Sequence, residues 1–270
     1  MISGASLASA QGVVQYSGLD AGVGPGDPRP NSDAMLALFD ASAVLLGDRI
    51  LNVLDFETTN LGLFLNLFPA DTGVAGLSIL ASAQSSGVDT EVTVQTSPGV
   101  EGFNTTAAGS RFLKIEEDQP GAGVEPPVGI TFDFATPVVA FGAYFTGADP
   151  RVAGAITAIF DNGQIHTIPI NGSIGGGSQF WGFTSADPNA GISRVTILAS
   201  PELGVGTDVI GIDEVRWVFI PEPGMALLLV LSGLIVARRR RQPSRYIPGP
   251  RFALPRIDNS SVQFKEAALK

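Results

Sequence analysis

The chain lacks cysteine altogether and has a single histidine, His166, among its 270 residues. The absence of cysteine excludes disulfides, thiolate nucleophiles and cysteine-ligated zinc or iron–sulfur sites. The single imidazole excludes any site that needs two histidines. Charged residues are also scarce, at 16%, and the formal net charge of −10 disfavours general affinity for nucleic acid. Apolar residues make up 44% of the chain, which is enough for a sizeable core and argues against a largely disordered protein.

The charges are distributed unevenly along the chain. Residues 1–220 carry 7 basic and 23 acidic side chains, whereas residues 221–270 carry 9 basic and 3 acidic ones. Segments of opposite sign predict an acidic body and a basic tail with separate roles.

Three features follow one another where the acidic body meets the basic tail. An uncharged apolar stretch, 225–237, is preceded by Pro221, Glu222 and Pro223 and followed by Arg238, Arg239, Arg240 and Arg241. As a helix the stretch would be about 20 Å long, shorter than the ~30 Å hydrocarbon core of a bilayer. Four consecutive arginines cannot enter a protein core and favour the cytoplasmic face of a membrane. We therefore expect a hydrophobic helix in the membrane, with the acidic body outside and the arginines inside.

This order of features, over residues 220–241, resembles the PEP-CTERM sorting signal of Gram-negative bacteria that make exopolysaccharide. The resemblance implies handling by an exosortase, a membrane-embedded protease-transpeptidase thought to cut near the Pro-Glu-Pro motif. It also implies export across the inner membrane, transient anchoring there, and then a place at the cell surface or outside the cell. An ordinary short membrane anchor with a coincidental Pro-Glu-Pro is the alternative.

Both ends of the chain depart from a simple sorted protein. The family's signal normally ends the protein, whereas here residues 242–270 follow it. We expect these residues to form a disordered basic tail, either a cytoplasmic appendage or the product of a shifted reading frame. Residues 1–10 have no charged start and no long apolar run, but Ala8-Ser9-Ala10 before Gln11 fits a small-residue cleavage site. We interpret 1–10 as the remnant of a signal peptide whose true start lies upstream.

One helix is expected in the body, within an N-terminal segment 11–48. Asn31 or Ser32 can cap it, and it should run to about Leu46. Its apolar stripe at helical spacing is predicted to pack on a sheet. The stripe consists of Met35, Leu38, Phe39, Ser42, Leu45 and Leu46.

The rest of the body, residues 49–219, is predicted to form short strands separated by glycine, proline, asparagine and aspartate. A tight hairpin is expected at Asp161-Asn162-Gly163, because Asn-Gly tolerates positive φ angles. No run of alternating helices and strands appears, so the prediction is a mainly β, antiparallel two-sheet sandwich of jelly-roll type. The expected strands are 50–56, 74–80, 88–95, 111–116, 128–134, 138–146, 153–160, 164–170, 179–184, 192–199 and 208–219.

Phrases of the body resemble those of secreted PEP-CTERM proteins, whose bodies are similar to galactose-binding-like sandwiches. The phrases are Asp55-Phe56-Glu57, 24–32, 130–134, 137–142, 180–183 and 210–215. The resemblance implies carbohydrate binding, with exopolysaccharide as a candidate partner, and a structural calcium. In the resembled sandwiches an acidic residue on an early strand meets another on the last strand at the ion. The matching positions here are Asp55, Glu57 and Asp213, and ordinary hydrogen-bonded carboxylates are the alternative.

Candidate catalytic groups are few. His166 lies in a predicted strand, and no Gly-x-Ser-x-Gly elbow supplies a nucleophile, so a structural role is favoured. The Gly/Ser-rich loop 172–178 lacks the lysine of a phosphate-binding loop. Glu116, Glu117, Asp118 and Glu125 form an acidic cluster that is typical of a solvated turn. Tyr144 and Trp181 are the aromatic residues that could be exposed to stack on a sugar ring, with core packing as the alternative.

These observations predict an exported, exosortase-sorted, non-catalytic surface or extracellular-matrix protein. A carbohydrate-binding module acting outside the cell is the first alternative. A secreted glycosidase is the second, and it would require two carboxylates about 5–10 Å apart in a cleft.

Overall fold

The computed structural model describes residues 13–46, 50–81, 89–94, 102–116, 128–147, 156–168, 177–185, 187, 191–199 and 209–220. The predicted signal-peptide remnant, sorting motif, hydrophobic helix, arginines and basic tail lie outside these ranges. In the described part, no helix is both long and apolar enough to cross a bilayer.

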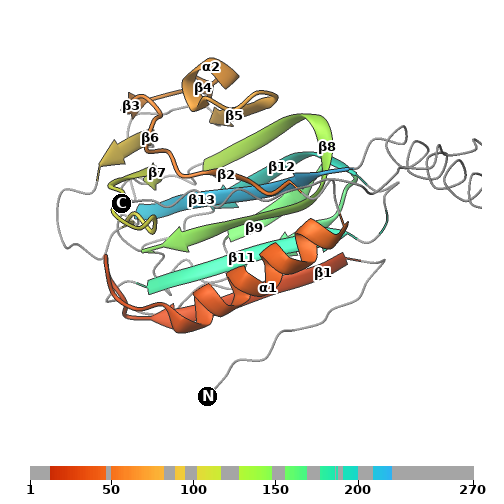
Figure 1. Cartoon of the computed structure of the whole chain (residues 1–270). Helices are drawn as coiled ribbons and strands as arrows, with labels where there is room; N and C mark the ends of the chain where they lie inside the picture. The colour runs from red at the N-terminus through yellow and green to blue at the C-terminus, as the bar shows by residue number, and fades with distance from the viewer. Residues whose placement is uncertain are drawn as a thin grey trace, which may run out of the picture. The chain divides into compact units, whose positions relative to one another are not determined.

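The described residues are mostly β-strand (Figure 1). Two helices accompany the strands, α1 (Pro30–Leu46) and the short α2 (Pro69–Thr72). The strands are β1 (Val13–Ala21), β2 (Asn52–Leu54), β3 (Gly62–Leu63), β4 (Asn66–Leu67), β5 (Leu77–Ala81), β6 (Asp89–Val94), β7 (Arg111–Glu116), β8 (Val128–Thr146), β9 (Ile156–Phe160), β10 (Ile165–Thr167), β11 (Gly177–Ser185), β12 (Ile192–Ala199) and β13 (Val209–Phe219).

One antiparallel sheet runs in the order β10-β9-β12-β8-β13-β7-β6-β3, and the 19-residue strand β8 folds it into two layers. The first part of β8 pairs with β5 and β12, and its second part pairs with β11 and β13. Figure 1 shows the bend of β8. Pro137 lies at this bend, where its missing N–H interrupts the ladder. The mainly β, antiparallel fold with one N-terminal helix is confirmed, although the two strands expected at 128–134 and 138–146 are one.

Side-chain alternation on the bent strand builds two cores. Between the layers, Phe141 on the second part of β8 lies 5.2 Å from Phe132 on the first part, measured between ring centroids. Phe160 of β9 and Phe183 of β11 meet across the same core at 4.2 Å. The opposite face of the second layer carries a smaller cluster beneath α1, made of Tyr16, Phe39, Ala43, Val139, Ala140, Tyr144, Phe180 and Val218.

Helix α1 lies against β1 and β11 (Figure 1). Its first backbone N–H groups, at Asn31 and Ser32, donate to the Asp20 carboxylate of β1 at 3.1 and 2.7 Å. An acidic group at a helix N-terminus satisfies free donors and complements the helix dipole. Because Asp20 is itself buried, this contact fixes where the helix starts relative to the sheet.

The buried face of α1 differs from the predicted stripe. Ser32, Phe39 and Ala43 are buried, whereas Leu38 and Leu45 are 51% and 83% exposed. The helix approaches the sheet closely over glycines, since a Cβ placed on Gly182 would lie 2.9 Å from the Phe39 ring. Small residues at the contact therefore decide which face is buried. The expected stripe is therefore confirmed at Phe39 and Met35 and wrong at its leucines, because apolar residues occur all around this helix.

The hairpin predicted around Asp161-Asn162-Gly163 is confirmed by the antiparallel pairing of β9 and β10. Its turn has three residues, because the Phe160 amide donates to the Gln164 carbonyl at 2.9 Å. Gly163 supplies the one positive φ, 84°. This is the three-residue hairpin turn, in which a residue with positive φ follows a tight turn.

Candidate functional site

Asp213 holds one side of the loop 102–110. It lies on β13 opposite Tyr144 of β8, so both side chains are on the face that α1 covers. Its Oδ2 atom accepts hydrogen bonds from the backbone amides of Thr105 and Thr106 at 2.7 and 3.1 Å. It also accepts hydrogen bonds from the hydroxyls of the same two residues at 2.9 and 3.3 Å. The other oxygen, Oδ1, is buried and has no hydrogen-bond partner among the described residues.

Glu57 holds the other side of the same loop. Its Oε1 atom accepts the side-chain amide of Asn104 at 2.8 Å and the backbone amides of Ser110 and Arg111 at 2.8 and 2.9 Å. Asp55 supports this arrangement, because its Oδ1 accepts the Glu57 amide at 3.1 Å. Two acids from distant parts of the chain thus fix the loop 102–110 by accepting its donors.

The three acids proposed as calcium ligands have these other partners instead. Strand β2 ends at Leu54, directly before Asp55, and pairs with β13, which carries Asp213. However, Oε1 of Glu57 and Oδ2 of Asp213 face N–H and O–H groups. Across the described ranges, no group of three His, Cys, Asp or Glu residues could hold a metal ion. The geometry therefore gives Asp55, Glu57 and Asp213 the role of organising a loop.

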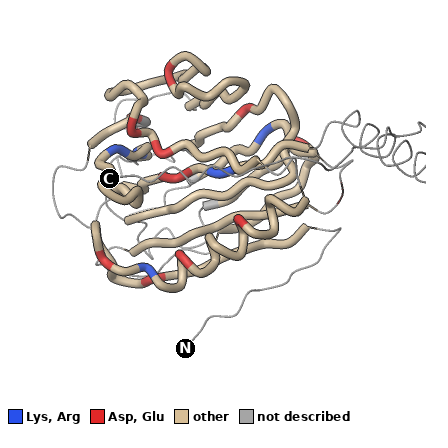
Figure 2. The backbone as a smooth tube through the Cα atoms, viewed as in Figure 1, with Lys and Arg blue, Asp and Glu red and all other residues tan. Residues whose placement is uncertain are grey.

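Burial changes the ionisation of several groups on this face. It raises the pKa of Asp213 to about 7, against the opposing effect of the hydrogen bonds from Thr105. Burial is the largest cause that raises the pKa of Tyr144, and the hydrogen bond to Asp33 is the second. Burial also raises the pKa of Asp40, whose Oδ2 lies 3.0 Å from Arg216. Figure 2 shows acidic positions on α1 and on several strands, with few basic positions among them.

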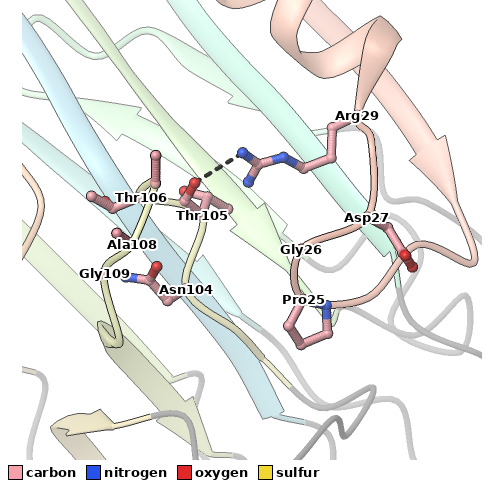
Figure 3. Close-up of a pocket in the computed structure, with 10 residues that line it drawn as sticks. Pro25, Gly26, Asp27, Arg29, Asn104, Thr105, Thr106, Ala108 and Gly109 are labelled. Carbon is pink, nitrogen blue, oxygen red and sulfur yellow. Dashed lines mark hydrogen bonds between the residues drawn. The ribbon is translucent and has the colours of Figure 1, made fainter.

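A cleft of about 470 Å³ lies between the loop that precedes α1 and the loop 102–110 (Figure 3). Arg29 reaches from one wall to the other and donates to the Thr105 carbonyl at 2.9 Å. Its guanidinium also lies 4.9 Å above the centre of the Tyr144 ring, a favourable cation–π distance. The lining residues are Pro25, Gly26, Asp27, Arg29 and Asn104 to Gly109.

Three non-glycine residues of the described chain have positive φ, and all three belong to this region. They are Phe56 at 60°, Ala108 at 61° and Glu214 at 45°. Phe56 directly precedes Glu57, Glu214 directly follows Asp213, and Ala108 lies in the loop that these two acids hold. Such conformations cost roughly 1–3 kcal/mol each and persist where the surroundings impose them. The fold therefore maintains unfavourable backbone conformations in the loop 102–110 and beside the two acids that hold it.

Ala108→Gly should raise the free energy of unfolding by about 0.5–1 kcal/mol. Glycine relieves the cost of positive φ, and the greater freedom it gives the unfolded chain offsets part of that gain. Ala107→Gly is the matched control, because Ala107 is a neighbouring exposed alanine without positive φ. It should be neutral or slightly destabilising in urea unfolding. Equal losses for the two variants would show that Ala108 is not strained.

The two aromatic residues proposed to stack on sugar are not exposed. Tyr144 is 1% exposed and donates its hydroxyl to Asp33 of α1 at 2.6 Å. Trp181 is fully buried and packs near Phe183 between the layers. The reading of these two residues as core residues is confirmed, because α1 covers one face of β8 and β11 and the other layer covers the opposite face.

The remaining candidate catalytic residues that the structure describes lie in strands. His166 lies on β10 with its ring 5.0 Å from that of Phe160, and partial burial lowers its pKa. Glu116 ends β7, and the rest of its acidic cluster lies outside the described residues. Sequence reasoning missed Arg29 and the threonines 105 and 106. Their only signal was the setting of Arg29 between two prolines and the Asn-Thr-Thr run at 104–106.

Comparisons with known proteins found no matching family model and no matching curated protein. Among solved structures, the chain is similar to the K2 cleaved adhesin domain of Lys-gingipain, at 14% identity and a TM-score of 0.35, covering 63% of this chain and 98% of that one. It is also similar to an exo-β-agarase, at 11% identity and a TM-score of 0.33, covering 63% of this chain but only 25% of the agarase. A family 11 carbohydrate-binding module of a cellulosomal cellulase from Clostridium thermocellum matches at 8% identity and a TM-score of 0.27, covering 61% of this chain and 97% of the module. We draw no function from similarities at this level.

Proposed function

We propose that the chain is an exported, non-catalytic protein of the cell surface or extracellular matrix that an exosortase sorts at Pro221-Glu222-Pro223. The observation that carries this proposal is the order of three features directly after the last strand of the body. Strand β13 ends at Phe219, and the motif, the apolar stretch 225–237 and the four arginines follow in that order, with one residue before the motif and one after it. The resemblance to the PEP-CTERM signal rests on that order.

The physical properties of these segments suit the proposed route. Burying mostly aliphatic side chains at roughly 1–3 kcal/mol each favours residence of 225–237 in the membrane. The arginines at 238–241 oppose translocation and keep their end of the helix on the cytoplasmic side. Proline at 221 and 223 favours extended backbone, which is the form that a protease binds. The acidic body would then remain outside the membrane.

The proposal predicts that changing the motif stops processing. In a host with an exosortase, the double variant Pro221→Ala/Pro223→Ala should stay in the membrane fraction at full mass. The wild-type chain should appear in the surface fraction at a lower mass. Pro248→Ala/Pro250→Ala is the matched control, because Pro248-Gly249-Pro250 has the same spacing in the basic tail. Identical processing of all three chains, or full-length wild type in the surface fraction, would overturn the proposal.

A non-catalytic role also agrees with the cleft. A glycosidase needs two carboxylates about 5–10 Å apart. Of the described residues that line the cleft, only Asp27 carries a carboxylate, and it accepts a hydrogen bond from the Gly24 amide of its own loop at 2.8 Å. The cleft therefore favours binding over hydrolysis. Carbohydrate binding is the second candidate function, with exopolysaccharide as the candidate partner, and retention of the chain on extracted exopolysaccharide is its test.

A further inference from the structure

The walls of the cleft are held in place before any ligand arrives. Glu57 and Asp213 accept six hydrogen bonds from the loop 102–110, two at Glu57 and four at Asp213, and Glu57 accepts a seventh from Arg111 at the start of β7. In the opposite wall, the Gly24 amide donates a hydrogen bond to the Asp27 carboxylate, which holds that loop in place. Pre-organised groups bind with less loss of conformational entropy. A cleft of about 470 Å³ is also within the usual size of small-molecule sites.

Arg29 is the cleft's charged donor. Its side chain is 18% exposed, and one N–H group donates to the Thr105 carbonyl. The Nε atom lies 3.7 Å from Asp33. Arginine has five N–H donors in a planar fork, so donors remain without a partner among the described residues. Figure 3 shows the guanidinium placed between the two walls.

The surroundings of Arg29 exclude several classes of ligand. A cation would be repelled by the guanidinium. An anion gains little, because Asp33 offsets the charge of Arg29 and residues 1–220 carry 23 acidic side chains against 7 basic ones. A large apolar ligand would find little to contact, since Pro25 and two alanines are the only hydrophobic residues in the part of the lining that the structure describes. What fits is a neutral ligand with several hydroxyl groups.

We propose that this cleft binds a neutral glycan through hydrogen bonds to Arg29 and to the backbone groups of Ala107 and Ala108. The amides of Thr105, Thr106 and Ser110 are already used, because they donate to Asp213 and Glu57. The small residues Gly26, Ala107 and Ala108 leave the polar backbone accessible to sugar hydroxyls. The inference deepens the carbohydrate-binding candidate, because it names the site and the class of sugar. It does not depend on sorting, so a failure of exosortase processing would leave it unaffected.

The test uses the purified full-length chain in detergent and saturation-transfer NMR. The probes are neutral oligosaccharides of three to five glucose, galactose or mannose units, and the matching uronate oligomers. At least one neutral series should bind, and Arg29→Gln should weaken it at least tenfold, because hydrogen bonds to a charged donor are lost. Arg194→Gln is the control, since Arg194 lies on β12 in an exposed ion pair with Asp133.

A second variant keeps the test decisive if Arg29→Gln disturbs the fold. Ala107 is exposed at the cleft, so Ala107→Phe should fill the space without crowding the core and should also reduce binding at least tenfold. Binding of a neutral series that is lost in both variants and kept in the control supports the proposal. Binding of uronates alone, binding that survives Ala107→Phe, or no binding of any probe would overturn it.

Discussion

Replacing Asp213 by asparagine should flatten the dependence of stability on pH between about pH 4 and pH 8. The folded chain holds the Asp213 proton up to a pKa of about 7, mainly because burial disfavours the carboxylate, whereas the unfolded chain releases it near 3.8. Between these values the folded chain binds more protons than the unfolded chain. Raising the pH through this window therefore removes stability, and the full difference corresponds to about 4 kcal/mol.

Asparagine mimics the protonated acid at this position. Its carbonyl oxygen can accept the donors of Thr105 and Thr106, and its amide nitrogen takes the place of Oδ1, which has no partner among the described residues. The unpaired amide costs about 1–3 kcal/mol at every pH, so it lowers the free energy of unfolding without changing how that free energy depends on pH. Relative to Asp213→Asn, the wild type should lose up to about 4 kcal/mol from pH 4 to pH 8.

Urea unfolding at closely spaced pH values measures this difference. Asp133→Asn is the matched control, because it also removes one acid, but from the exposed ion pair with Arg194. Its curve should run parallel to that of the wild type. Parallel curves for wild type and Asp213→Asn would contradict the role given to the buried carboxylate.

Gly18→Ala should destabilise the fold by about 3 kcal/mol, because it pushes α1 away from β1. A Cβ at Gly18 would lie 2.2 Å from the Asn31 carbonyl oxygen and 2.8 Å from Cγ of Met35. Backbone atoms at the helix start cannot move aside without breaking the contact between Asp20 and the helix. Overpacking costs typically 1–3 kcal/mol, and a clash with backbone is at the upper end.

Gly24→Ala is the control for Gly18→Ala. The nearest atom to a Cβ at Gly24 is an Asp27 carboxylate oxygen at 3.7 Å, an ordinary contact. This variant should change the free energy of unfolding by less than about 0.5 kcal/mol, as surface substitutions usually do. Thermal or urea unfolding of both variants gives the comparison. A Gly18→Ala variant as stable as Gly24→Ala would show that the helix can settle elsewhere on the sheet.

Local signals in the sequence were sufficient for much of the fold. The alternation of Val, Ile, Phe and Thr and the Asp161-Asn162-Gly163 turn predicted strands and a hairpin that the structure contains. Strand β1 was missed because its buried positions include Tyr16, Gly18 and Asp20, which do not alternate in hydropathy. Asp20 is buried there because it binds the start of α1, a tertiary role that no local pattern reveals.

The site was harder to predict than the fold. The acids Asp55, Glu57 and Asp213 were identified as important, but the partners of Glu57 and Asp213 come from residues 104–111, far away in sequence. A carboxylate that binds a metal and one that binds backbone amides look alike in a sequence. For Tyr144 and Trp181 the sequence left core packing and sugar stacking open, because strand alternation shows which side of a strand a residue faces and not whether that side is covered.

The measurement that tests the sorting proposal most directly is the mass of the mature protein's C-terminal peptide in the surface fraction of exosortase-active cells. The proposal predicts that the chain ends near Glu222, shortly after β13, and that no peptide from residues 246–270 accompanies the body. A surface protein whose body is still joined to residues 246–270 in those cells would contradict the proposal and leave a plain membrane anchor.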